Sequence, residues 1–155
     1  MKIHILEVTK LPSNTDMIKL YSQKILSLAT ELPFTSPLKN PDISITKRSP
    51  VCGSTISIEL KVNNNHISEF SQEVKACALG QAAATIVANS IIGISFNEVR
   101  TARVQLLNML KKNGKTPDQP FEGLEVLTPA KDYKNRHASI MLSLEAITEG
   151  LESLI

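Results

Sequence analysis

The segment Pro50-Val51-Cys52-Gly53-Ser54 runs directly into an alternating stretch, Thr55 to Val62, around which the rest of the chain can be placed. Apolar residues occupy every second position of that stretch and polar residues the positions between, the pattern of a strand with one buried face. Cys52 therefore lies just before the start of a strand, with Pro50 before it and Gly53 after it. The apolar positions are Ile56, Ile58, Leu60 and Val62; the polar ones are Thr55, Ser57, Glu59 and Lys61.

A turn and a second strand follow. Asn63-Asn64-Asn65 predicts a tight hairpin turn, because asparagine tolerates the left-handed conformation that such turns require. A partner strand from His66 to Lys75 would run back antiparallel and bring Cys77 beside Cys52. A further strand is expected at Asp42 to Lys47, inside a proline-rich connection.

Helical spacing of apolar residues accounts for most of the remaining chain. The expected helices run from Met17 to about Glu31 after the cap Asp16, from Ala78 to Ile91 before Gly93, from the capping box Ser95–Glu98 to Lys112 before Gly114, and from Asp132 or Asn135 onward. Leu124 to Leu127 is expected to be a short apolar connector. The positions expected to face the core are Leu20, Ile25, Leu28 and Leu32 (with Tyr21 and Leu26), then Val99, Val104, Leu107 and Leu110, and finally Ile140, Leu144, Ile147 and Leu151. We therefore expect an α+β fold, with a small, mainly antiparallel three-stranded sheet packed against helices.

Composition limits the class of protein. A chain of 155 residues with 42% hydrophobic and 21% charged residues fits one globular domain, residues 1–155, in which 1–15 would be a leader or an edge strand. A net charge of +2 and 4% aromatic residues argue against nucleic-acid binding. No apolar run approaches the ~20 residues that a membrane span needs, and no signal peptide is expected. The predicted compartment is thus the cytoplasm, where cysteines are free thiols, ligands or catalytic groups.

The two cysteines are the candidates for chemistry. Cys77 precedes a helix, whose positive N-terminal end favours a thiolate, and Cys52 would expose its sulfur to the same pocket. The alternative is two ordinary buried cysteines. His137, in Arg136-His137-Ala138-Ser139, could bind a metal or carry a proton, although a single histidine is more often a satisfied surface or helix-terminal residue.

Together these segments resemble the NifU N-terminal/IscU/SufU family of iron–sulfur cluster assembly proteins, over about residues 17–154. The resemblance rests on Val51-Cys52-Gly53 entering a strand and Val74-Lys-Ala-Cys77-Ala-Leu-Gly-Gln-Ala-Ala-Ala84 opening a helix. It rests also on Asn40-Pro41 and on Arg136-His-Ala-Ser139 ahead of Glu145-Ala-Ile147. The segment between Cys77 and Arg136 is most similar to the SufU type.

The resemblance implies a ligand set of three cysteines and an aspartate for zinc or a cluster. This chain has Ser54 at the aspartate position and Ser139 at the third cysteine, while His137 lies one position from the family histidine. A neutral serine is a poor ligand for a soft metal. The departure argues against an ordinary three-cysteine site, and it also affects sulfur acceptance, which the family assigns to the third cysteine.

Three hypotheses follow. The first is an iron–sulfur cluster assembly protein, a carrier rather than a catalyst, that binds iron, a transient cluster or zinc through Cys52 and Cys77 with His137 as a third ligand. Gly53 and Arg136 would support the site, and the protein would be a monomer or a dimer. A cysteine desulfurase and recipient apoproteins would be its partners, as the resemblance implies. The others are a non-catalytic interaction protein that lost its ligands, and a thiol sulfur acceptor.

Overall fold

The computed structural model describes residues 20–155. The expected leader or edge strand at 1–15 and the start of the helix expected from Met17 lie outside these residues. The helices and strands are, in order, α3 (Gln23–Ala29), β1 (Ile43–Arg48), β2 (Thr55–Asn63), β3 (His66–Lys75), α4 (Ala78–Asn89), α5 (Phe96–Lys111), the 3₁₀ helix η1 (Glu122–Asp132) and α6 (Lys134–Glu152).

The described strands form a three-stranded antiparallel sheet in the order β1-β2-β3, which confirms the expected fold class. Ile56, Ile58 and Leu60 of β2 are buried, as the alternation predicted. The β2–β3 turn places Asn64 and Asn65 at φ of 52° and 60°, the left-handed conformation expected for them. At the turn Asn63 faces His66, and a bulge between Lys61 and Val62 then shifts the pairing by one residue, so that Thr55 faces Lys75.

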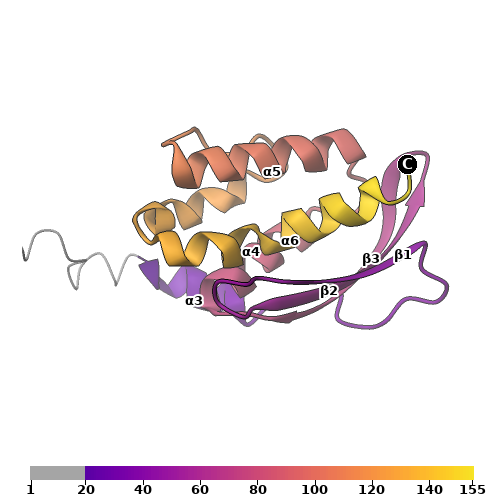
Figure 1. The fold of residues 1–155 in the computed structure, drawn as a ribbon, viewed down its shortest axis with the longest axis horizontal. Helices are drawn as coiled ribbons and strands as arrows, with labels where there is room; N and C mark the ends of the chain where they lie inside the picture. Colours follow the sequence, from indigo (N-terminus) through magenta and orange to yellow (C-terminus); the bar gives the residue numbers. More distant parts are fainter. Residues whose placement is uncertain (1–19) are drawn as a thin grey trace, which may run out of the picture.

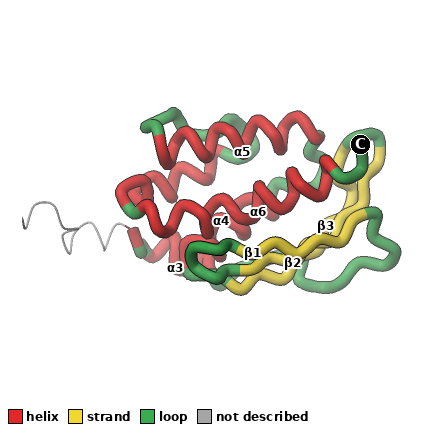
Figure 2. Tube along the Cα trace, viewed as in Figure 1, coloured by secondary structure: helices red, strands yellow, loops and turns green. Residues whose placement is uncertain are grey.

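Helices cover one face of this sheet in two layers (Figure 1). α6 packs against β1 and β2, α4 packs against β3, and α5 lies beyond them against α6 and η1. Figure 2 shows the same arrangement, with the loops gathered at the ends of the strands and helices. The core between sheet and helices is made mainly of Ile, Leu, Val and Ala side chains, and the buried alanines of α4 allow close packing there.

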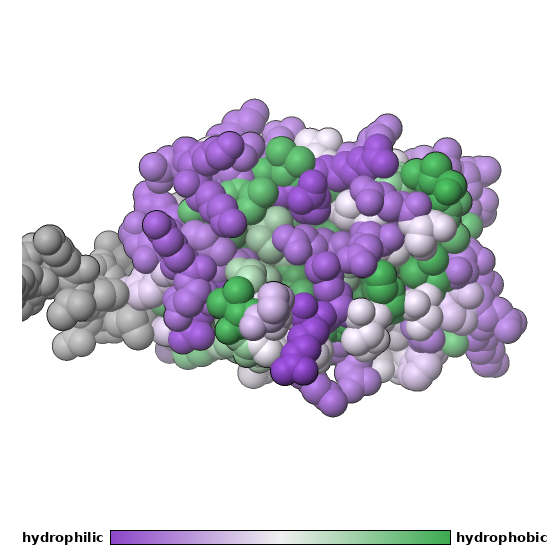
Figure 3. Space-filling view, viewed as in Figure 1, coloured by the Kyte–Doolittle hydropathy of each residue, from purple (hydrophilic) through white to green (hydrophobic). Residues whose placement is uncertain are grey.

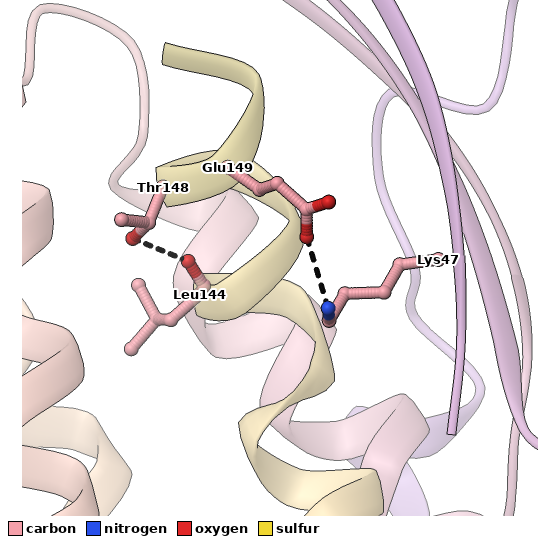
Figure 4. Close-up of polar contacts among 4 residues, drawn as sticks. All are labelled: Lys47, Leu144, Thr148 and Glu149. Carbon is pink, nitrogen blue, oxygen red and sulfur yellow. Dashed lines mark hydrogen bonds and ion pairs between the residues drawn. The ribbon is translucent and has the colours of Figure 1, made fainter. Parts of the chain in front are cut away.

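α6 approaches the sheet closely. A Cβ added at Gly150 would lie 3.1 Å from Ile43 Cγ2, so a larger residue at this position would push the helix away from β1. Lys47 of β1 donates to Glu149 of α6 at 2.9 Å, whereas the hydroxyl of the neighbouring Thr148 bonds within the helix, to the carbonyl of Leu144 at 2.7 Å (Figure 4). The Lys47–Glu149 contact and the close approach of Gly150 hold the last helix along the strands, so that its first turns reach the opposite end of the sheet.

Several sequence-based expectations about the helices were wrong. The helix expected up to about Glu31 is interrupted: Leu20 is helical, the chain turns at residues 21–22, and α3 begins at Gln23, where the Ser22 hydroxyl accepts from the Ile25 amide, and ends at Ala29. Leu26 and Val104, expected in the core, are 48% and 46% exposed. In α5 Val99 and Leu110 are buried as expected and Leu107 is partly buried against the core, while Ala102, Leu106 and Met109 are buried in addition. The expected connector 124–127 is part of η1, which contains Pro129. α6 starts at Lys134, between the two predicted starts.

Other helix signals were confirmed. Ser95 and Glu98 form the predicted capping box of α5. The α5 C-terminus is closed by the Gly114 amide, which donates to the Asn108 carbonyl, while Asn113 takes the left-handed conformation. The α6 stripe of Ile140, Leu144, Ile147 and Leu151 is buried. In residues 20–155 no helix combines the length and the apolar character needed to cross a bilayer.

Candidate functional site

A tight turn between β1 and β2 presents Cys52. The Ser49 amide donates to the Ser54 carbonyl at 2.8 Å, and the Gly53 amide donates back to the Ser49 carbonyl at 2.9 Å. Gly53 has φ +73°, a conformation that side chains with a Cβ adopt at a cost. This closed turn leaves Cys52 exposed at its tip.

The β2–β3 hairpin places Cys77 at the same end of the sheet as Cys52. Thr55 pairs with Lys75, so Cys52 and Cys77 lie just beyond the last paired positions of β2 and β3. Cys77 is the N-cap residue of α4, in an extended conformation, and its side chain makes no capping bond. The predicted convergence of the two cysteines is therefore correct, because the register of one hairpin determines it.

Two buried hydroxyls connect the two thiols. Cys52 Sγ lies 3.1 Å from Ser54 Oγ, Ser54 Oγ lies 3.3 Å from Ser139 Oγ, and Ser139 Oγ lies 3.4 Å from Cys77 Sγ. Ser54 and Ser139 are 5% and 1% exposed. We call Cys52, Ser54, Ser139 and Cys77 the thiol–hydroxyl chain; it joins the β1–β2 turn, α6 and the start of α4.

The hydroxyl groups change the acidity of Cys52. Hydrogen bonds with the Ser49 hydroxyl and then with the Ser54 hydroxyl lower the pKa of the Cys52 thiol to about 7, and burial opposes them. The thiol donates to Ser49 Oγ at 3.4 Å, and the hydroxyl can turn its own hydrogen to the sulfur once the thiol is ionised. A hydroxyl that donates to sulfur favours the thiolate over the thiol. Because Cys52 is also exposed, its sulfur is accessible to a reaction partner in ionised form near neutral pH.

Both cysteines line one open pocket together with Lys75 and Arg136. Lys75 Nζ lies 3.5 Å from Glu73 Oε1, so part of its charge is already balanced, whereas Arg136 forms no ion pair among residues 20–155. Ser139 reaches the site because Gly80 of α4 faces it: a Cβ at position 80 would overlap Ser139 Oγ. The sequence signal for this close approach was the small-residue pattern at the start of α4.

His137, expected as a third ligand, is not brought to the two cysteines. Its ring is 4% exposed, and Nε2 lies 3.0 Å from the Ala130 carbonyl and 3.1 Å from the Lys131 carbonyl. Residue 137 lies two positions before Ser139 on a helix, so the two side chains point in different directions. Within residues 20–155 no three His, Cys, Asp or Glu side chains are grouped as a metal site would require.

Two residues at the site were missed from the sequence. Ser49, 3% exposed, lies 3.4 Å from Cys52 Sγ through its hydroxyl, and Lys75 lines the pocket. Ser49 precedes Pro50 and stands three positions before Cys52, a spacing at which a serine can bond to the far side of a turn. Ser54, Ser139, Gly53 and Arg136, which the sequence did single out, all lie at the site.

Comparison with models of known protein families finds no match. Among curated proteins, the iron–sulfur cluster assembly scaffold protein IscU of Thermotoga maritima is 21% identical over 135 residues, which are 87% of this chain and 94% of that protein. The iron–sulfur cluster assembly scaffold protein SufU of Fervidobacterium islandicum shares the fold, with a TM-score of 0.75 and 20% identity over 86% of this chain and 98% of its own.

A third protein is more similar. The crystal structure of the N-terminal part of a NifU-like protein from Brucella abortus superimposes with a TM-score of 0.87, covering 90% of this chain and 96% of that one. The two sequences are 36% identical over this span. Identity at this level across almost the whole of both chains, on a shared fold that brings Cys52 and Cys77 together, shows that this chain belongs to the family of NifU N-terminal, IscU-like and SufU-like proteins.

Proposed function

We propose that this protein takes part in iron–sulfur cluster assembly, holding iron or a nascent cluster transiently on Cys52 and Cys77 and passing it to recipient proteins. Thiolates are the ligands that iron–sulfur clusters and zinc prefer. The observation that carries the proposal is that both cysteines line one pocket, next to the cations Lys75 and Arg136. Positive charge there would offset the negative charge of a thiolate-bound cluster.

The donor set of one chain is incomplete for a cluster. Cys52 and Cys77 supply two thiolates, and the neighbouring Ser54 and Ser139 carry hydroxyls, which are poor ligands for iron or zinc. A cluster of the common four-thiolate kind would need two more ligands. Two copies of the chain that face each other through this pocket would supply four thiolates, so we expect the loaded form to be a dimer.

Anaerobic reconstitution tests this proposal. The protein is incubated with ferric iron, sulfide and a thiol reductant, desalted, and analysed for iron, acid-labile sulfide and native mass. We expect bound iron and sulfide, a visible thiolate-to-iron absorption, and a loaded species of twice the chain mass. The control is Cys52→Ala with Cys77→Ala; if it retains as much iron and sulfide as the unmodified protein, the cysteines are not the ligands and the proposal fails.

Sulfur acceptance is a second candidate, favoured by the acidity and exposure of Cys52. The Cys52 thiolate would attack the outer sulfur of a persulfide on a cysteine desulfurase. The new bond joins Cys52 Sγ to that sulfur, the bond to the desulfurase cysteine breaks, and that cysteine leaves as a thiolate, so no oxidant is needed. Mass spectrometry after incubation with desulfurase and cysteine should show one added sulfur on Cys52; unmodified Cys52 would exclude this step.

Both activities have the same partners. A cysteine desulfurase would supply the sulfur, and recipient apoproteins would take the product, in the reducing cytoplasm where free thiols persist. An interaction protein without ligand chemistry would instead bind its partners unchanged after both cysteines are replaced. Measuring desulfurase binding by the Cys52→Ala, Cys77→Ala variant, beside its iron content, separates a loss of chemistry from a loss of docking.

A further inference from the structure

A second depression lies on the helical side of the protein, between α5, the end of η1 and the start of α6. It has a volume of about 550 Å³ and is separate from the pocket of the cysteines. Its apolar lining includes Leu107, Leu110 and Met141, and Figure 3 shows apolar surface over α5 and α6 surrounded by polar side chains. We call this depression the α5–α6 groove.

The wall of the groove is held in place. His137, which lines it, holds the last residues of η1 to α6 through the Ala130 and Lys131 carbonyls at 3.0 and 3.1 Å. This gives the buried histidine a structural role. A groove whose walls are fixed in this way needs little rearrangement to accept a ligand.

The charge around the groove is unbalanced. Lys111, Lys131 and Lys134 line it and are exposed, against the single carboxylate of Glu145. Within residues 20–155 none of these three lysines forms an ion pair. An apolar floor with a rim of unpaired cations is complementary to an apolar face flanked by carboxylates.

We propose that the α5–α6 groove binds an acidic, amphipathic segment of a partner protein, with leucine-type side chains on the floor and glutamate or aspartate against the lysines. A helix laid into an apolar groove is a common mode of peptide recognition. This inference rests on the proposed function, because the groove lies next to the thiol pocket at which that function would take place. Val51, 64% exposed, lines the groove, and the next residue, Cys52, lines the thiol pocket, so a segment seated here brings the body of its protein to Cys52.

A second copy of this chain is a poorer occupant. The chain has a net charge of +2, and a symmetric contact through this face would set lysines against lysines. Like charges brought together across an interface oppose binding. The partner is therefore a protein with an acidic binding segment.

The test uses the intact protein without metal, so that its result is independent of any chemistry at the cysteines. A short fluorescent helical peptide with leucine on one face and glutamate on the other is titrated and followed by anisotropy, beside an isomer with lysine in place of glutamate. We expect the acidic peptide to bind at least about tenfold more tightly than its basic isomer, and more weakly as salt is raised.

Paired variants locate the binding. Lys131→Glu with Lys134→Glu should weaken the acidic peptide about tenfold, and Val51→Ser should weaken it severalfold because an apolar contact is lost. Lys24→Glu with Lys39→Glu changes the net charge by the same amount at exposed sites outside the groove, and it should leave binding within about twofold. Equal loss in both double variants, or equal affinity for the two peptides, would overturn the proposal, as would self-association of the protein through this face. If the acidic peptide does not bind but the protein loads iron normally, the proposal about the groove fails while the proposed function stands.

Discussion

The strongest prediction concerns the reactivity of Cys52. Replacing Ser49 by alanine removes the hydrogen bond that contributes most to the lowered pKa of the Cys52 thiol. The pKa should then rise from about 7 toward the ordinary value of 9.0. Ser54→Ala should act in the same direction with a smaller effect, because its bond ranks second.

The size of the effect follows from two opposing terms. At pH 7 a thiol with a pKa of about 7 is about half ionised, whereas one with a pKa of 9.0 is about 1% ionised, a difference of about fiftyfold. A more acidic thiolate is a weaker nucleophile, and over two units this costs about six- to tenfold in exchange with a disulfide. Cys52 should therefore react about five- to eightfold faster at pH 7 than an ordinary thiol, and the full restoration of its pKa would remove that advantage.

The assay is exchange with a chromogenic aromatic disulfide, followed from pH 5 to pH 10 on a Cys77→Ala background so that one thiol reports. The rate should have its midpoint near pH 7 in this background and at higher pH in Ser49→Ala. Ser36→Ala is the matched control, since Ser36 is exposed and outside the site. A midpoint near 9 in the parent, or one that Ser49→Ala leaves at 7, would refute the assignment of the hydroxyl bonds.

The same shift has a consequence for stability. Because the pKa of Cys52 is lower in the folded chain than in the unfolded chain, ionised Cys52 stabilises the fold in full above about pH 9. That contribution is lost as the pH falls through about 7. The exposure of Cys52 keeps it small, so the reaction rate is the better measure.

Three further predictions concern the same site. Gly80→Ala should lower the free energy of unfolding by about 1–3 kcal/mol, because the added methyl overlaps Ser139 Oγ. The loss should be smaller in a Ser139→Ala background. Equal losses in the two backgrounds, measured by urea unfolding, would show that this contact is not the cause. Gly53→Val should cost about 1–2 kcal/mol at φ +73°, and Gly53→Asn less, since asparagine tolerates this conformation; equal melting temperatures for the two would contradict the backbone argument. Ser54→Asp with Ser139→Cys should raise the affinity for zinc at least about tenfold, measured in competition with a chelator. The control combines Ser54→Asp with Ser143→Cys, which places the new thiol one turn further along α6. If the zinc affinity of the Ser139→Cys variant does not rise, Ser139 is not the ligand position.

The sheet could be predicted because its signals are local. Alternation in 55–62 and three asparagines in a row determine the hairpin, and the register of the hairpin places Cys77 beside Cys52. The capping box at Ser95 is likewise contained in four residues. By contrast, the exposure of Val104 depends on which face of α5 meets α6 and η1, and apolar spacing alone cannot distinguish a buried valine from an exposed one.

The candidate site divides in the same way. Cys52, Ser54 and Cys77 could be placed together because one hairpin and the start of α4 carry them, whereas Ser139, on α6, could be placed there only through the family resemblance. The direction of His137 could not, since one position along a helix turns a side chain by about 100° and here directs it toward the η1 carbonyls. The effect of Ser49 on Cys52 depends on a turn that is closed by two backbone hydrogen bonds, and no single residue of the turn predicts that geometry.

The thiol–hydroxyl chain bears on how this site would pass iron or a cluster to a recipient protein. Ser54 and Ser139 bond each other and one thiol each, so the turn, α4 and α6 are linked at the pocket by hydrogen bonds of the protein itself. Under the proposed function, loading of iron or a cluster would require little rearrangement of these elements. Because hydroxyls are weak ligands, only two strong metal–sulfur bonds per chain would oppose release. Under the proposed function, the serines thus favour a pocket that keeps its shape when empty and gives up its cargo more readily than three cysteines and an aspartate would.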